Sequence, residues 1–177
     1  MQLLMTNREM ERTLLKISRD LVESHPDIQE AALVGIRRRG VPLARRLKRN
    51  IEDLTGHRLP LGILDINFYR DDLSLVGPQP IVGASQLDFS VTGRTLLLVD
   101  DVLYTGRTVR AALESLLDYG RPKRVELVVL IDRGHRELPI QADFTGRRVA
   151  TREDQTVDVH IAAVDRDEGV FLTRKGI

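Results

Sequence analysis

Two adjacent acidic residues, Asp100 and Asp101, are the residues of this sequence best suited to catalysis. They end a run of leucine and valine that begins at Thr95 and is typical of a buried central strand, and ligands of open α/β sheets bind where such strands end. Neighbouring carboxylates accept hydrogen bonds from the vicinal hydroxyls of a ribose. They also stabilise the cationic sugar through which a ribosyl transfer passes. We therefore expect this acid pair to act on a ribose.

A short turn rich in hydroxyl groups connects the acid pair to the next predicted helix. Gly106 lets the backbone approach a phosphate closely, and the hydroxyls of Thr105 and Thr108 donate hydrogen bonds to phosphate oxygens. A helix N-terminus adds unpaired N–H groups and a partial positive charge. We expect a monophosphate to bind the loop made of Val102, Leu103, Tyr104, Thr105, Gly106, Arg107 and Thr108. The alternative, a capped helix after a core strand with solvated acids, explains the acid pair alone but not the whole ordered segment.

Apolar runs and amphipathic stripes alternate along the chain, which predicts an α/β fold with a parallel sheet flanked by helices. The predicted strands are Ala31–Ile36, Leu61–Ile66, Thr95–Asp100 and Val125–Ile131, with weaker candidates at Val157–Val164 and Val170–Thr173.

Three predicted helices separate these strands. The first opens with a capping box at Thr6–Glu9, and the second has Pro42 in its first turn. Their apolar stripes are Met10, Leu14, Ile17 and Leu21 in the first, Leu43, Leu47, Ile51 and Leu54 in the second, and Val109, Ala112, Leu113, Leu116 and Leu117 in the third.

The composition is that of an ordinary globular domain. A chain of 177 residues fits one domain spanning residues 1–177, with 42% apolar and 30% charged residues. The sequence contains no cysteine, which excludes disulfides and thiolate metal sites. Apolar runs are too short to cross a bilayer, and Met1–Arg12 carries charges and lacks the apolar region of a signal peptide, so we expect a cytoplasmic protein. The net charge of +1 is low for a dedicated nucleic-acid binder, so a nucleic-acid contact would need a local basic patch.

The segment Leu96–Thr108 resembles the phosphoribosyl pyrophosphate (PRPP) signature of the type I phosphoribosyltransferases. Together with Leu64–Ile66, Tyr69–Ser74 and Asp132–Ile140, it resembles the pyrimidine operon regulators, a bifunctional family of RNA-binding attenuation proteins and uracil phosphoribosyltransferases. The resemblance extends from about Val34 to Gly146. It implies a type I phosphoribosyltransferase-like parallel sheet with a small hood above its carboxyl edge. It also implies conversion of uracil and PRPP to UMP and pyrophosphate.

The resemblance assigns roles to two further loops. Gly35–Gly40 would bind pyrophosphate through Arg38 and Arg39, although the family usually has threonine at the position of Arg38. Residues 67–89 would form a flexible loop that closes over the site and places Tyr69 and the catalytic Arg70 on the pyrophosphate. The alternatives are a solvated run of arginines and an ordinary surface excursion.

The hood would lie at about residues 132–146, with Arg133 beside the substrate. Backbone groups of the strand Val157–Ile161 would approach the ribose or the base, so Val157 is a candidate substrate-binding residue. The alternative for Arg133 and Arg136 is surface ion pairing with Glu137.

The leaving pyrophosphate implies Mg²⁺ as the cofactor, because a hard cation with oxygen ligands neutralises its charge. Mg²⁺ keeps several waters, so the sequence singles out no metal-binding residue. The family also implies a homodimer or a higher oligomer.

Binding of an mRNA leader is implied by the same family. Arg12, Lys16 and Arg19 share one face of the first predicted helix, and basic residues recur at Arg136, Arg147, Arg148 and Arg152. We expect Arg19, Arg136 and Arg147 to bind RNA. Arg136 and Arg147 match basic positions of the family, whereas Arg19 replaces a typical histidine, and Leu15, Gln141 and the segment Val149–Arg152 also depart from the family pattern. The alternative is a solvated helix face.

Three functions remain open from the sequence. The leading hypothesis is a UMP-responsive, RNA-binding regulator of pyrimidine genes that also has uracil phosphoribosyltransferase activity. The second is a UMP-sensing regulator with weak catalysis. The third is a purine phosphoribosyltransferase without a role in RNA binding.

Overall fold

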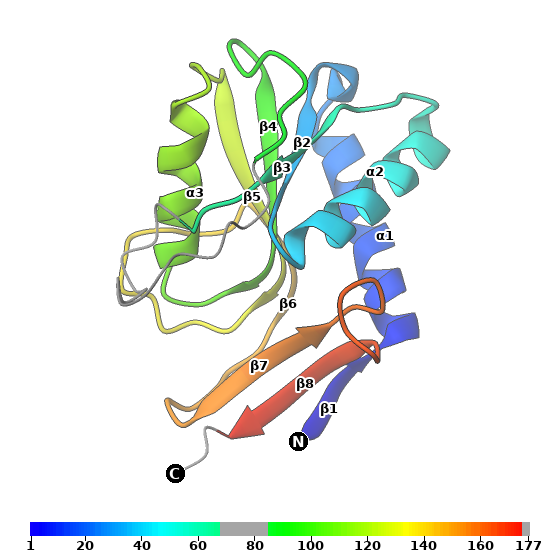
Figure 1. Cartoon of the computed structure of the whole chain (residues 1–177). Coiled ribbons are helices and arrows are strands. Elements are labelled where there is room, and N and C mark those ends of the chain that lie inside the picture. The colour runs from blue at the N-terminus through cyan, green and yellow to red at the C-terminus, as the bar shows by residue number, and fades with distance from the viewer. Residues whose placement is uncertain (68–84, 175–177) are drawn as a thin grey trace.

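Five parallel strands form the larger sheet of the computed structural model, which describes residues 1–67 and 85–174 (Figure 1). Their order is β3-β2-β4-β5-β6, and each neighbouring pair is parallel. The strands are β2 (Ala32–Ile36), β3 (Leu61–Leu64), β4 (Thr95–Leu103), β5 (Arg124–Asp132) and β6 (Phe144–Arg148).

Helices cover both faces of this sheet because successive residues of its central strand point to opposite sides. Leu97 and Val99 of β4 pack in one core cluster with residues of α1 (Asn7–Ser24) and α2 (Gly40–Thr55). Leu96 and Leu98 pack in a second cluster with residues of α3 (Arg107–Leu117). Figure 1 shows α1 and α2 on one side of the sheet and α3 on the other. The predicted α/β fold is thereby confirmed.

The chain connections open a crevice between β2 and β4. The connection from β2 to β3 runs through α2 on one face, whereas the connection from β4 to β5 runs through α3 on the other face. The loops that follow β2 and β4 therefore leave the sheet in opposite directions. Such a point at the carboxyl edge is where open α/β sheets bind ligands.

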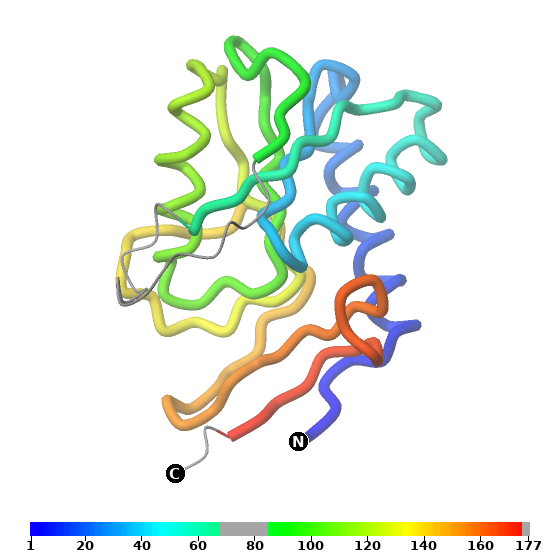
Figure 2. The backbone as a smooth tube through the Cα atoms, viewed as in Figure 1, coloured from blue at the N-terminus to red at the C-terminus, as the bar shows by residue number. Residues whose placement is uncertain are grey.

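A smaller antiparallel sheet joins the two ends of the chain. Its order is β1 (Gln2–Thr6), β8 (Gly169–Arg174) and β7 (Gln155–His160). Figure 2 shows β1, at the start of the chain, running beside β8. This sheet lies beyond the carboxyl edge of the larger sheet, where β7 contacts β4 (Figure 1).

The larger sheet differs from the prediction at its carboxyl edge. β4 continues to Leu103 and β5 to Asp132, because these two residues still pair with each other. The acid pair therefore lies inside a hydrogen-bonded strand and not in a free loop. A short 3₁₀ helix, Ile28–Glu30, precedes β2.

Several predictions at the periphery were wrong. Residues 144–146, expected in the hood, belong to β6 at the edge of the larger sheet, and the strand predicted at Val157–Val164 ends at His160. Leu54 and Leu117 are 42% and 60% exposed, because each lies at the last turn of its helix, past the edge of the core.

The first helix begins as its sequence predicts. The backbone N–H of Glu9 donates to Thr6 Oγ1 at 3.3 Å, and the backbone N–H of Thr6 donates to Glu9 Oε2 at 2.7 Å. The capping box is confirmed, and it fixes the point at which the chain passes from β1 to α1. None of the helices in residues 1–67 and 85–174 has the length and apolarity needed to span a membrane.

Gly40 lets α2 start directly against β4. A Cβ atom at this position would lie 2.4 Å from the backbone oxygen of Val99, closer than real contacts allow. The absence of a side chain therefore brings the loop after β2 next to the acid pair.

We expect Gly40→Ala to lower the free energy of unfolding by about 1–3 kcal/mol, because the overlap with a backbone oxygen outweighs the better helix propensity of alanine. Urea unfolding would measure the change. Arg49→Ala, on the exposed face of α2, is the control and should stay within about 0.5 kcal/mol of the wild type. An unchanged stability of Gly40→Ala would contradict the close approach.

Candidate active site

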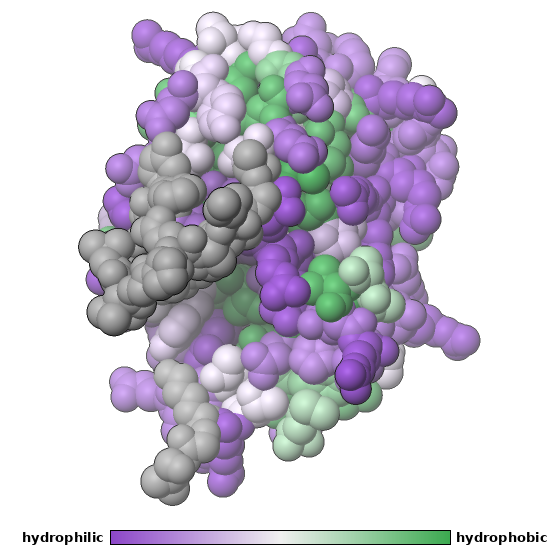
Figure 3. Space-filling model, in the orientation of Figure 1, coloured by the Kyte–Doolittle hydropathy of each residue, from purple (hydrophilic) through white to green (hydrophobic). Residues whose placement is uncertain are grey.

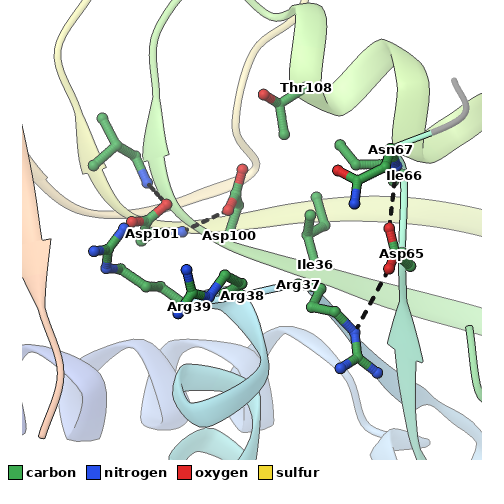
Figure 4. Close-up of a pocket in the computed structure, with 11 residues that line it drawn as sticks. Ile36, Arg37, Arg38, Arg39, Asp65, Ile66, Asn67, Asp100, Asp101 and Thr108 are labelled. Carbon is green, nitrogen blue, oxygen red and sulfur yellow. Dashed lines mark hydrogen bonds and ion pairs between the residues drawn. The ribbon is translucent and has the colours of Figure 1, made fainter. Parts of the chain in front are cut away.

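A cavity of about 540 Å³ occupies the crevice at the carboxyl edge (Figure 4). Its walls are Arg37–Arg39 after β2, Asp65–Asn67 after β3, Asp100–Val102 of β4, and Thr108 at the start of α3. Basic and acidic side chains thus face one another across the cavity, with cations on the β2 side and carboxylates on the β4 side.

The acid pair is held by the backbone beside it. Asp100 Oδ1 accepts a hydrogen bond from the backbone N–H of Asp101 at 2.9 Å, and Asp101 Oδ1 accepts one from that of Val102 at 2.8 Å. Asp100 is 7% exposed. Burial raises the pKa of Asp101, although its hydrogen bonds and the nearby Arg39 act in the opposite direction. A cation brought beside this pair would therefore find two fixed carboxylates and little competing water.

Arg39 is bound to an acid that lies 126 positions later in the chain. Its Nε and Nη2 atoms donate to the two carboxylate oxygens of Asp165 at 3.0 and 2.9 Å. Asp165 also accepts a hydrogen bond from the backbone N–H of Ile161 at 2.9 Å. Arg39 lowers the pKa of Asp165 to about 2, and the same bond raises the pKa of Arg39.

Asp165 has no counterpart among the predicted site residues. The sequence offered one signal for Asp165 as a site residue. It directly follows the apolar run Ile161–Val164, just as Asp100 follows the apolar run of the central strand. Only the tertiary structure pairs it with Arg39.

Arg37 and Arg38 occupy the rest of the β2 loop. The backbone N–H of Arg37 donates to Leu64 O at 2.9 Å, and its Nε atom lies 4.0 Å from Asp65 Oδ2, so the loop is tied to the end of β3 (Figure 4). The peptide bond between Arg37 and Arg38 is cis. Arg38 is exposed and lines the cavity.

A second cavity of about 290 Å³ adjoins the first one. It is lined by residues 102–109 and Glu137, and it shares Val102 and Thr108 with the larger cavity. Gly106, with a φ of 92°, precedes α3 and has no side chain to cap it, and the backbone N–H of Arg107 donates to Thr105 Oγ1 at 3.2 Å. The first turn of α3 therefore offers its N–H groups and its partial positive charge to an anion.

The two cavities form one continuous surface with three chemical parts. An arginine loop stands at one end, the acid pair in the middle, and an uncapped helix start at the other end. This order suits a ligand with two anionic ends and a hydroxylated or cationic centre.

Comparison with known proteins identifies the family of this chain. Residues 4–166 match the family model of the phosphoribosyl transferase domain. A bifunctional protein PyrR from Caldicellulosiruptor bescii is 51% identical over 96% of this chain and 93% of its own length. The corresponding protein of Thermus aquaticus is 49% identical over 97% of this chain and 95% of its own length. The chain belongs to the PyrR group of the phosphoribosyltransferase family. The resemblance to the pyrimidine operon regulators is thereby confirmed.

Solved structures show the same phosphoribosyltransferase fold. A hypoxanthine-guanine phosphoribosyltransferase from Bacillus anthracis superposes with a TM-score of 0.71 at 14% identity, covering 98% of both chains. A hypoxanthine phosphoribosyltransferase from Trypanosoma cruzi gives a TM-score of 0.75 at 17% identity, covering 98% of this chain and 95% of its own. At these identities the likeness concerns the fold alone.

Two predicted substrate-binding residues of this phosphoribosyltransferase do not line either cavity. Arg133 is 4% exposed, and its guanidinium group stacks 4.0 Å above the ring centre of Tyr104. It donates to Gln155 O at 2.5 Å and to Thr151 Oγ1 at 3.3 Å. Val157 is 5% exposed, with its side chain in the core cluster beneath α1 and α2. The role predicted for Val157 concerns its backbone groups and stays a prediction.

The predicted RNA-binding residues fall into two groups. Arg19 is exposed on α1, and Arg147 on the neighbouring β6 donates to Leu4 O at 2.6 Å. Arg136 follows β5, with a side chain that is 19% exposed and paired with Asp132, the residue that lies opposite Arg148 of β6 in the sheet. Tyr69 and Arg70, expected above the pyrophosphate, lie outside the described residues.

Asp165→Asn should lower stability at neutral pH by on the order of 1 kcal/mol, a value reduced by the solvent exposure of Arg39. The pKa of Asp165 is depressed from its ordinary 3.8 to about 2, so its contribution is present above about pH 4 and is lost as the pH falls toward 2. Urea unfolding at pH 7, 4 and 3 should show the difference between variant and wild type shrinking at acidic pH. Asp154→Asn, in an exposed pair with Arg152, is the control. A difference that does not depend on pH would refute the Arg39–Asp165 assignment.

Proposed function

We propose that the protein transfers the ribose 5-phosphate group of PRPP to uracil, giving UMP and pyrophosphate, and that UMP in the same site controls binding to the mRNA leader of pyrimidine genes. One observation carries the proposal: the arginine loop, the acid pair and the uncapped helix start follow one another in the order of the three parts of PRPP. Membership of the PyrR group supports uracil as the acceptor base.

Each part of the site has a role in this reaction. Arg38 and Arg39 bind the pyrophosphate, and the loop Leu103–Thr108 binds the 5′-phosphate at the start of α3. Asp100 and Asp101 accept hydrogen bonds from the ribose hydroxyls. As the bond to pyrophosphate breaks, positive charge grows on the sugar beside the two carboxylates. They stabilise the transition state more than the ground state for this reason.

Arg39 must change its partner when pyrophosphate binds. In the structure its guanidinium group is engaged with Asp165, and the nearby carboxylate of Asp101 also contributes to the raised pKa of Arg39. A pyrophosphate offers the same bidentate oxygen geometry with more charge. Asp165 therefore keeps the arginine in place in the absence of ligand without blocking its role.

Magnesium fits the donor set of this site. Among the residues the structure describes, no three His, Cys, Asp or Glu side chains gather into a metal site. Asp100 and Asp101 offer hard oxygen atoms, and Mg²⁺ keeps most of its waters. Bound together with pyrophosphate, it would neutralise the charge of the leaving group.

The RNA-binding face is proposed on α1 and β6. The two elements pack together. Hydrogen bonds with Thr6 are the main reason for the lowered pKa of Glu9, and the charges of Arg12 on α1 and Arg147 on β6 lower this pKa further. Arg19 is exposed on the same helix. In Figure 3 hydrophilic side chains cover the side of the molecule formed by α1 and α2. A homodimer or higher oligomer, as the family implies, would extend this face.

The test of the enzymatic proposal is a transfer assay. Purified protein with Mg²⁺ and PRPP is supplied with uracil, hypoxanthine or guanine, and nucleotide formation is followed by chromatography. UMP as the main product supports the proposal. Purine nucleotides would favour the purine alternative, and no product together with UMP-dependent RNA retention would favour a UMP sensor with weak catalysis.

Asp100→Asn combined with Asp101→Asn should reduce the rate of transfer by on the order of 100-fold, because both positioning and charge stabilisation are lost. The turnover number is measured at saturating PRPP, and thermal unfolding checks that the variant is folded. Near-normal turnover would remove the acid pair from the mechanism.

Arg19→Ala should weaken binding of the transcribed leader and reduce the salt dependence of its affinity by about one phosphate contact. Filter binding over a range of salt concentrations gives both quantities. Arg58→Ala, which removes an exposed arginine beyond the end of α2, is the matched control. Equal affinity and salt dependence in Arg19→Ala and the control would exclude α1 from the RNA face.

A further inference from the structure

Three successive carbonyl groups of the phosphate loop accept hydrogen bonds from one neighbouring segment. Leu103 O accepts the backbone N–H of Arg133 at 3.0 Å, and Thr105 O accepts those of Glu137 and Leu138 at 2.9 and 3.1 Å. Tyr104 O, between them, accepts a hydrogen bond from Nη1 of Arg136 at 2.8 Å. Three successive carbonyls of the loop therefore point toward residues 133–138.

This orientation determines where the N–H groups of the loop point. In a trans peptide unit the carbonyl and the following N–H point in opposite directions. The N–H groups of Tyr104, Thr105 and Gly106 therefore point away from residues 133–138. They lie in the loop that lines the 290 Å³ cavity, where N–H groups are needed to bind a phosphate.

Arg136 is the only side chain in this set of donors, and it is fully engaged. Its Nε atom donates to Ile140 O at 2.8 Å, and its Nη2 atom donates to Asp132 Oδ2 at 2.7 Å. Nη1 also lies 3.3 Å from Gly134 O. One guanidinium group thus connects the end of β5, the segment that follows it, and the phosphate loop.

The charge of Arg136 is already matched inside the protein. Burial of Asp132 would raise its pKa, but hydrogen bonds from Arg136 and from the backbone of Gly134 outweigh burial and lower it. An arginine with an ionised partner and a side chain that is 19% exposed is poorly placed to bind an RNA phosphate. Its bonds to Asp132 and to Tyr104 O instead tie Arg136 to the end of β5 and to the phosphate loop.

Neighbouring contacts hold the loop in the same orientation. The ring of Tyr104 packs under the guanidinium group of Arg133, and Arg107 Nε donates to Glu137 Oε2 at 2.6 Å. A Cβ atom at Gly106 would lie 3.3 Å from Ile140, so the segment after β5 is packed closely against the loop. In this assembly Arg136 supplies the central hydrogen bond.

We propose that Arg136 is a positioning residue for phosphate recognition, which holds the carbonyl of Tyr104 away from the phosphate so that the loop presents its N–H groups. The inference rests on the phosphate site of the proposed function and assigns to Arg136 a role in ligand binding. Without this guanidinium group the Tyr104 carbonyl loses its donor, and the peptide unit is free to turn its oxygen toward the anion.

The test compares UMP with uridine, which differ only in the phosphate. Calorimetry should show that Arg136→Ala weakens UMP binding by about tenfold or more, the cost of an unsatisfied carbonyl and a reoriented peptide unit, while uridine binding stays within about twofold. The KM for PRPP should rise with little change in kcat, because a binding interaction present throughout the reaction is lost. Arg136→Lys should recover little, since an ammonium group cannot bond Tyr104, Asp132 and Ile140 at once.

Arg58→Ala is the matched control. This arginine is 82% exposed and pairs only at the surface with Glu52, so its removal should leave both affinities unchanged. Equal losses for UMP and uridine in Arg136→Ala, with a lower melting temperature, would reduce the residue to a structural role. An unchanged UMP affinity, combined with a weaker and less salt-dependent binding of RNA at saturating UMP, would assign Arg136 to RNA contact. Both outcomes overturn the proposal.

The result is separable from the identity of the base. If the wild type binds IMP in preference to UMP, the uracil assignment fails, and the same comparison is made with IMP and inosine. The ratio of the two affinities then still decides the role of Arg136.

Discussion

The parallel pairing of β4 between β2 and β5 is the constraint on which the site depends. Gly35 of β2 lies opposite Val99 of β4, and Leu103 of β4 lies opposite Asp132 of β5. This register places the arginine loop on one side of the acid pair and the segment after β5 on the other. Because α2 and α3 cover opposite faces of the sheet, neither helix fills the crevice between them. The ligand surface is thus a consequence of strand order, and the side chains supply its chemistry.

Three arginines at the carboxyl edge of the sheet lie beside acidic residues before any ligand arrives. Arg39 is paired with Asp165, Arg37 lies near Asp65, and Arg136 is paired with Asp132. The three pairs have different consequences. Arg39 lines the cavity and is in a position to exchange its carboxylate for a pyrophosphate, whereas Arg136 is enclosed and holds the backbone of the phosphate loop. Arg39 and Arg136 are the same type of residue, but they differ in their bonding partners and in their exposure. These two properties decide whether an arginine binds ligand or orders the protein.

Local chemistry was predictable wherever it depended on neighbours in the chain. The acid pair and the Thr-Gly turn stand within a few residues of one another, and the strands before them are continuous apolar runs. The capping box at Thr6 and the buried stripe of α1 follow the same logic, since both depend on spacings of three and four residues. The short strands β1 and β6 were missed, because edge strands with mixed polarity carry no clear period. Leu54 was predicted in the buried stripe of the second helix but is exposed, because periodicity does not reveal where a helix extends past the edge of the core.

The sequence by itself thus determined the α/β class, the central strand, and the residues that suit a ribose and a phosphate. Tertiary structure alone decided the partners of the arginines. Asp165 reaches Arg39, and Arg136 reaches Tyr104, across separations of 126 and 32 positions. Such pairs form only when strand order brings distant loops to the same edge of the sheet. The sequence around a charged residue does not indicate which distant acid or carbonyl group it will bind. For the same reason the sequence did not reveal that Arg133 is buried against Tyr104.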